Sequence, residues 1–182
     1  TSTMIYTSFE FFSDKNMEFS VNISAKDILD ETTKRIILNN VKLFPKPELI
    51  VFEILESEGI NNFSEIISFI KAVKEMGCKI AIDDFGSGYS NFERIYQLEV
   101  DYVKIDGSLI KNIDTNQNNE ILVQTIVDFS KKIGIKTIAE FVHSESVYKK
   151  VKELGIDYAQ GYYIGEPSPN LVVNHKLEGS ND

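Results

Sequence analysis

Short apolar segments alternate with amphipathic helical segments along most of the chain, and this alternation limits the fold more than any other feature. We predict strands at residues 18–23, 49–54, 79–83, 102–105 and 136–139, and a sixth, short strand within residues 158–164. We predict helices at residues 25–39, 63–76, 92–98, 120–133 and 144–154. Such units, repeating every 20 to 35 residues or so, are roughly the size expected of parallel strands joined by crossover helices. The sequence therefore predicts an α/β fold with a parallel sheet, closed or open.

The length of the chain favours a single domain. Its 182 residues are enough for one sizeable core, whereas a complete eightfold α/β barrel usually needs about 200 residues or more. We find no linker or low-complexity run, so we predict one domain over residues 1–182. Within it, residues 1–17 form a partial leading helix and turn, and residues 170–182 form a tail.

Charge and hydropathy exclude some partners. The formal net charge is -9, whereas surfaces that bind DNA or RNA duplexes are usually basic. A small anion can still bind to an acidic pocket through metal cations. The sequence has no run of 18 apolar residues and no signal-peptide pattern. We therefore expect a cytoplasmic domain without membrane contact of its own, even if the parent protein is membrane-anchored.

Polar side chains recur where the predicted strands end, and most of them are oxygen donors. The carboxyl ends of the strands of an α/β barrel converge on one mouth, where active sites form. A single polar strand end has little meaning, but a set that spans the sheet predicts a site. The set consists of Asn22, Glu53, Asp83, Asp84, Lys104, Glu140 and Gln160.

The chemistry of this set favours a hard divalent cation. Clustered carboxylates repel one another, and a bound cation removes that penalty. Oxygen donors without histidine or thiolate select Mg²⁺ or Mn²⁺ over zinc. One or two such metals promote phosphoryl displacement, and Lys104 would stabilise the developing charge or hold the attacking water. The residues thus predict a two-metal phosphodiester site.

Individual residues also fit simpler roles. Asp84 alone fits a cap of the loop that follows, and Glu53 alone fits a surface acid at a strand end. Lys104 fits an edge residue or a Schiff-base lysine, and His143 fits either a ligand contact or a plain surface residue. Cys78 beside a strand fits a small buried hydrophobe. The prediction of a site therefore depends on the whole set.

Six sequence motifs resemble those of the EAL-domain family, in the same order. They are SVNIS at 20–24, FEILES at 52–57, IDDFGSGYS at 82–90, DYVKID at 101–106, IAE at 138–140 and QGYY at 160–163. The resemblance covers residues 22–167. It implies a TIM-like (β/α) barrel of the EAL type that hydrolyses cyclic di-GMP to pGpG with magnesium or manganese.

The resemblance also implies a role for each matching residue. Lys104 is similar to the catalytic lysine near the attacking water, and Gln160 and Asp84 are expected near the substrate. Glu56 is similar to the glutamate that anchors the loop 85–91, which implies a homodimer formed through that loop. The implied metal ligands, of which Glu53 and Glu140 also belong to the catalytic set, are Asn22, Glu53, Asp83, Asp84 and Glu140.

The chain departs from the family pattern in four places. The Glu-Ala-Leu motif of the first barrel strand is absent, so we expect a barrel that lacks this strand and a 182-residue chain that is impaired in catalysis. Leu55 replaces a threonine, Phe141 replaces a glycine, and His143 replaces an acid. An alternative function is therefore a degenerate, non-catalytic module that binds cyclic di-GMP or a partner protein. A third, more distant alternative is a Schiff-base barrel that uses Lys104.

Overall fold

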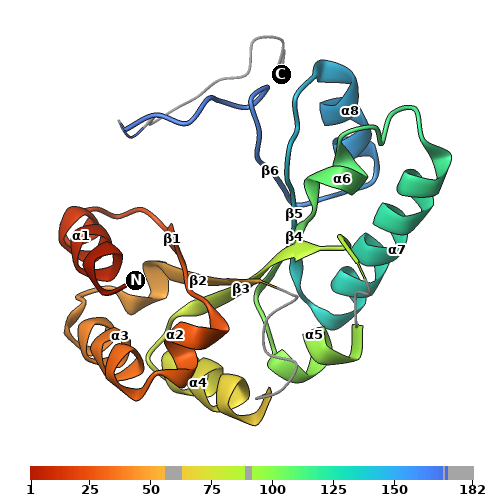
Figure 1. Ribbon diagram of the computed structural model, residues 1–182. Helices are drawn as coiled ribbons and strands as arrows, with labels where there is room; N and C mark the ends of the chain where they lie inside the picture. Colours follow the sequence, from red (N-terminus) through yellow and green to blue (C-terminus); the bar gives the residue numbers. More distant parts are fainter. Residues whose placement is uncertain (56–62, 89–91, 170, 172–182) are drawn as a thin grey trace. The chain divides into compact units, whose positions relative to one another are not determined.

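The structure is a computed structural model that describes residues 1–55, 63–88, 92–169 and 171 (Figure 1). The chain forms two compact units, of which the first is Thr1–Val103 and the second begins at Lys104. The boundary falls inside strand β4 (Tyr102–Ile105), so this strand contributes to both units. No helix in the described ranges combines the length and the apolar sequence that crossing a membrane requires.

The first unit contains the predicted alternation of strands and helices. Its strands β1, β2 and β3 are hydrogen-bonded in chain order with β4 next to β3, and the β1–β2 and β2–β3 pairs are parallel. In Figure 1, α2, α3 and α4 lie together along one side of these strands. The elements are α1 (Ser2–Phe12), β1 (Phe19–Asn22), α2 (Ala25–Leu29), α3 (Glu31–Leu43), the 3-10 helix η1 (Pro47–Leu49), β2 (Ile50–Leu55), α4 (Phe63–Glu75), β3 (Lys79–Phe85), α5 (Phe92–Leu98) and the start of β4.

The core of the first unit lies between the sheet and these helices. Helix α4 buries Ile66, Phe69, Ile70 and Val73, which largely matches the apolar stripe expected of an amphipathic helix. The ring of Phe69 meets that of Phe52 from β2 edge to face, with 6.0 Å between the ring centroids. This contact fixes α4 against the middle of the sheet.

The prediction of one helix over residues 25–39 is wrong, because Asp30 divides it into α2 and α3. The Asp30 backbone is extended, with φ −79° and ψ 108°, and its side chain accepts a hydrogen bond of 2.8 Å from the Thr33 N–H. A side chain that caps the next helix competes with continuation of the previous one. The apolar spacing continues across Asp30, so periodicity alone missed the break.

The second unit has the remaining strands and helices. Strands β4, β5 and β6 follow in chain order, and the β5–β6 pair is parallel with Ile138 opposite Tyr158. Helix α7 packs against α6 and β5. Besides the end of β4, the elements are α6 (Gly107–Ile110), α7 (Gln117–Ile133), β5 (Lys136–Ala139), α8 (Glu145–Glu153) and β6 (Tyr158–Ala159).

The sixth predicted strand, a short one within residues 158–164, is confirmed as β6, which is only two residues long. Beyond it the chain turns, and the Ile164 and Gly165 N–H groups both donate to the Gly161 carbonyl, at 2.9 and 3.0 Å. Gly161 has φ 150° and lies so close to the Val142 backbone that a Cβ would collide with it. A glycine is therefore required at the point where the strand ends.

In each unit, an aspartate that directly precedes one strand forms hydrogen bonds with the start of the neighbouring strand. In the second unit, the Thr137 N–H and hydroxyl donate to Asp157 Oδ2 at 2.9 and 3.0 Å, and the Asp157 N–H donates to Thr137 Oγ1 at 3.3 Å. In the first unit, the Ile80 N–H donates to Asp101 Oδ2 at 2.8 Å, and the Asp101 N–H donates to the Ile80 carbonyl at 2.9 Å. These bonds fix where β3 and β5 begin.

We predict that Asp157→Ala destabilises the protein by about 1 to 2 kcal/mol, because it leaves donors of the buried Thr137 without their acceptor. Urea denaturation followed by circular dichroism measures the change. Asp114→Ala, which removes an exposed carboxylate from the same unit, is the control and should leave the midpoint nearly unchanged. Equal midpoints for the two variants would contradict the role of Asp157.

Cys78 is buried as the sequence predicts, with 3% of its surface exposed. Burial raises the pKa of its thiol to about 12, so almost no thiolate is present in the folded protein at pH 8. We therefore predict that Ellman's reagent reacts slowly with the native protein at pH 8. In about 6 M urea it should react rapidly, because unfolding restores an ordinary thiol pKa near 8.5. A fast native reaction would show that Cys78 is accessible.

Candidate active site

Three of the predicted site residues share one face of the sheet in the first unit. Asn22 and Glu53 are register partners in the β1–β2 pair, and Glu53 is in turn the partner of Ala81 in β3. Partners in a parallel pair point to the same face, and residues two apart on a strand do so as well. Asp83 therefore lies on the face of Asn22 and Glu53, one step nearer the carboxyl end of β3.

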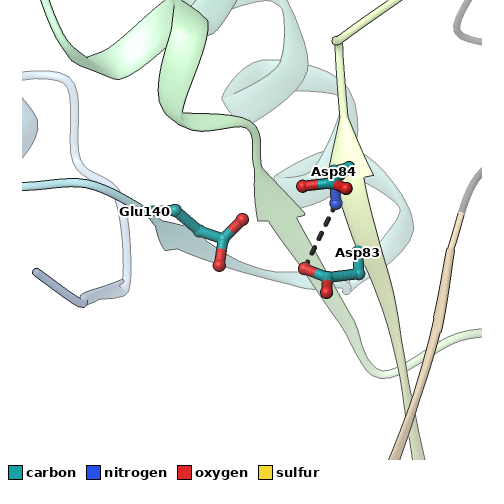
Figure 2. Close-up of side chains that lie close together, drawn as sticks. All are labelled: Asp83, Asp84 and Glu140. Atoms are coloured by element: carbon teal, nitrogen blue, oxygen red, sulfur yellow. Dashed lines mark hydrogen bonds between the residues drawn. The ribbon is translucent and has the colours of Figure 1, made fainter. Parts of the chain in front are cut away.

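The next residue, Asp84, interrupts the regular strand. Its φ of 57° lies in the left-handed region, which is unfavourable for a residue with a Cβ. Figure 2 shows both side chains and the hydrogen bond of 3.2 Å from the Asp84 N–H to Asp83 Oδ1. Carboxylate oxygens of the two residues come within 4.8 Å of one another, although successive side chains of a regular strand would point to opposite faces.

In the second unit, the structure brings Lys104 and Glu140 together. The Lys104 side chain lies in β4 with only 5% of the residue exposed. Its Nζ lies 3.0 Å from Oε1 of Glu140, which directly follows β5 and is drawn in Figure 2. A buried ammonium group is costly unless a partner charge compensates it. The pair therefore holds both side chains at the carboxyl ends of two strands.

Gln160 joins this end of the second unit through its backbone. Its N–H donates to the Ala139 carbonyl at 2.8 Å, and its own carbonyl accepts from the Val142 N–H at 2.9 Å. The Glu140 N–H donates to the Ile105 carbonyl at 3.2 Å. These bonds extend the ladder past the ends of β4 and β5 and hold the Gln160 backbone beside that of residues 139 and 142. The Gln160 residue itself is exposed.

The carboxylates at the strand ends of both units are donors that suit a hard cation. Asp83, Asp84, Glu53 and Glu140 are all half-buried carboxylates, and paired carboxylates at this depth are stabilised by a divalent ion. Glu56, the predicted loop anchor, lies outside the described residues. The loop 85–91 is described only as far as residue 88.

The residues that depart from the family pattern are at the surface. Leu55, at the end of β2, is 37% exposed, and Phe141 is 51% exposed. His143 is also exposed, and its Nδ1 lies 3.3 Å from the Phe141 carbonyl oxygen. Lys111 was missed by the sequence analysis, although its Nζ lies 5.9 Å from the centroid of the Phe141 ring. No pattern in the sequence connects these two residues, which are thirty positions apart.

We predict that Glu140→Ala destabilises the protein by about 3 kcal/mol, because it removes the carboxylate that pairs with the buried Lys104 ammonium group. The double variant Lys104→Met with Glu140→Ala should recover a large part of this loss, which urea denaturation of the single and double variants measures. Glu145→Gln, which breaks an exposed ion pair with Lys149, is the control and should leave the midpoint nearly unchanged. Additive losses in the double variant would show that the two side chains are not coupled.

Comparison with known proteins finds relatives that carry the same named activity. Cyclic di-GMP phosphodiesterase PdeB of Shewanella oneidensis is 36% identical over 151 residues, which are 82% of this chain and 18% of that protein. Cyclic di-GMP phosphodiesterase PdeA of Borreliella burgdorferi is 38% identical over 153 residues, 83% of this chain and 23% of that protein. The chain thus spans about a fifth of the length of these curated relatives.

A solved structure and a family match extend the comparison to the fold. A standalone EAL protein from Vibrio cholerae O395, in its c-di-GMP bound form, superposes with a TM-score of 0.80 at 27% identity, and the alignment covers 91% of this chain and 72% of that chain. The EAL domain family matches residues 2–167. The predicted EAL-type α/β fold is therefore confirmed, and the chain belongs to the EAL domain family.

Proposed function

We propose that this chain is the catalytic domain of a cyclic di-GMP-specific phosphodiesterase that hydrolyses the cyclic dinucleotide to pGpG. The observation that carries the proposal is the strained backbone at Asp84, which holds two carboxylates side by side at the end of β3. Strain of this kind is retained where function requires it. The named activity of the curated relatives supports the choice of substrate.

The side chains divide into two roles in this proposal. Asn22, Glu53, Asp83, Asp84 and Glu140 together bind magnesium or manganese, most simply as a two-metal site, because their oxygen atoms suit hard ions. When bound, such a cation neutralises the phosphate and makes a bound water more acidic. The carboxylates would hold the cation between themselves and the scissile phosphate, so that the acidic surroundings do not repel the phosphate.

Lys104 acts on the reacting group itself. Its ammonium group is buried and ion-paired with Glu140, so it is already oriented before substrate arrives and needs little rearrangement. In the proposed reaction it donates a hydrogen bond to the attacking water or to a phosphate oxygen, where negative charge increases. Gln160, exposed next to this pair, contacts the substrate outside the reacting phosphate.

The predicted homodimer also remains part of the proposal. Glu56 would anchor the loop 85–91, and the loop would link ligand binding to association of two chains. Phe85, at the start of the loop, is 1% exposed and its ring lies 5.5 Å from that of Phe92 in α5. The end of β3 and the start of α5 are thus packed together, which supports a loop that responds to changes at Asp83 and Asp84.

A second candidate function is cyclic di-GMP binding without hydrolysis. It is favoured by Phe141 and His143, which replace the small and acidic residues of the family pattern directly after Glu140. The two candidates differ in one measurement. Binding with turnover supports the phosphodiesterase, and binding without turnover supports the regulatory module.

The test incubates the purified full-length protein with cyclic di-GMP and Mn²⁺ and separates the nucleotides by chromatography. We expect pGpG to accumulate. We also expect Glu53→Gln, Asp83→Asn and Lys104→Met each to lower kcat by about 100-fold or more, because each removes a charged group that binds the metal or stabilises the transition state. Asp114→Asn, which changes an exposed carboxylate that has no role in the proposed site, should leave kcat unchanged. Absence of pGpG from the wild-type protein, under conditions where a known EAL enzyme is active, would refute the proposal.

Removal of metal gives an independent prediction. EDTA should abolish hydrolysis, and added Mg²⁺ or Mn²⁺ should restore it, whereas Zn²⁺ should restore it poorly because the donor set lacks nitrogen and sulfur. Calorimetry with the metal alone should show weaker binding in Asp83→Asn than in the wild-type protein. Hydrolysis that persists after EDTA treatment would exclude the proposed metal site.

A further inference from the structure

Phe141 has a backbone conformation that its side chain makes unfavourable. Its φ is 58°, in the left-handed region, where a bulky residue is a genuine outlier. Its ring gains little from burial to offset this, since 51% of the residue is exposed. A strained and exposed aromatic residue therefore points to a function for the ring.

The ring has a defined position within the second unit. Its Cβ packs against Gly107, where an added Cβ would lie 2.9 Å from it. The Nζ of Lys111 lies 5.9 Å from the ring centroid, and the His143 ring lies 5.8 Å away at an interplanar angle of 46°. The ring is thus held by neighbours on several sides while half of the residue stays open to solvent.

The neighbours of the ring define what it suits. Phe141 directly follows Glu140, whose carboxylate pairs with Lys104 at 3.0 Å, so the ring begins one residue from the proposed reacting centre. An exposed aromatic face of this kind stacks on a planar nucleobase. The Lys111 ammonium group adds positive charge beside it, which suits a ligand that carries phosphates.

We infer that Phe141 is a specificity-determining residue that stacks on one guanine base of the cyclic dinucleotide, with Lys111 beside it. This inference rests on the proposed function. In it, Glu140 and Lys104 act at the phosphodiester, and Phe141 orients the substrate from the adjacent position. Phe141 stands where the family pattern has a glycine, and its ring would add a contact with the base that a glycine does not make.

Kinetics of matched variants test the role of the ring face. Phe141→Leu keeps an apolar side chain on the same left-handed backbone but has no aromatic face, whereas Phe141→Tyr keeps the face. We expect Phe141→Leu to raise KM for cyclic di-GMP about tenfold, with kcat and the Mg²⁺ activation constant within about twofold of wild type. Phe141→Tyr should stay near wild type. Phe141→Gly, which relieves the backbone strain, should weaken substrate binding without lowering the urea midpoint.

A binding signal tests the stacking directly. The 182-residue sequence contains no tryptophan, so Phe141→Trp introduces a fluorophore at the position in question. Cyclic di-GMP in Mg²⁺ should quench its emission, ribose 5-phosphate without a base should not, and Phe11→Trp, at an exposed aromatic position on α1, should not respond to either.

The outcomes separate the inference from the proposed function. Unchanged KM in Phe141→Leu, or unquenched emission in Phe141→Trp, overturns the role of Phe141 while hydrolysis by the wild-type protein still supports the phosphodiesterase. A parallel loss of kcat and Mg²⁺ activation would assign Phe141 to positioning Glu140, which also overturns base stacking. Wild-type protein that binds cyclic di-GMP without turnover contradicts the proposed hydrolysis and leaves the stacking test valid. Wild-type protein that does not bind at all contradicts both.

Discussion

The charge on Lys104 is the constraint around which the second unit is organised. An ammonium group that is 5% exposed in a strand of otherwise apolar residues requires a compensating partner. Glu140 provides it at 3.0 Å, and this fixes how the end of β5 lies relative to β4. The backbone bonds of Gln160 with Ala139 and Val142 then follow from the same placement. A buried ion pair often adds little net stability relative to apolar side chains of similar volume, which favours the proposed catalytic role of Lys104.

Backbone strain lies where the polar strand ends are. Among the described residues other than glycine, Asp84, Glu99 and Phe141 have positive φ. Two of these three directly follow a predicted metal ligand. A left-handed residue after a strand changes the direction of the chain and breaks the alternation of faces, so consecutive side chains can serve one site. The cost is borne because the surrounding strands are held firmly, as the bonds of Asp101 and Asp157 illustrate.

Membership of a family and the chemistry of this particular chain are separate matters. The EAL fold explains why the carboxylates and Lys104 occur at strand ends. It does not explain the exposed ring of Phe141 or the position of Lys111 beside it. Those features belong to this sequence, and the proposed contact with a guanine base rests on them.

The sequence by itself determined the parallel α/β pattern and the polar strand ends. The periodicity of apolar residues is a local property of each segment, and a helix between two strands favours their parallel pairing. It also located Lys104 and Glu140, although not their ion pair, because partners 36 positions apart meet only through the sheet. The break at Asp30 and the exact end of β6 within residues 158–164 escaped prediction, since a capping side chain and a close approach of Gly161 to Val142 compete with periodicity. The left-handed φ of Asp84 and Phe141 was decided by tertiary structure alone. Neither residue type favours that conformation enough to reveal it, and only the packing around the strand ends makes it stable.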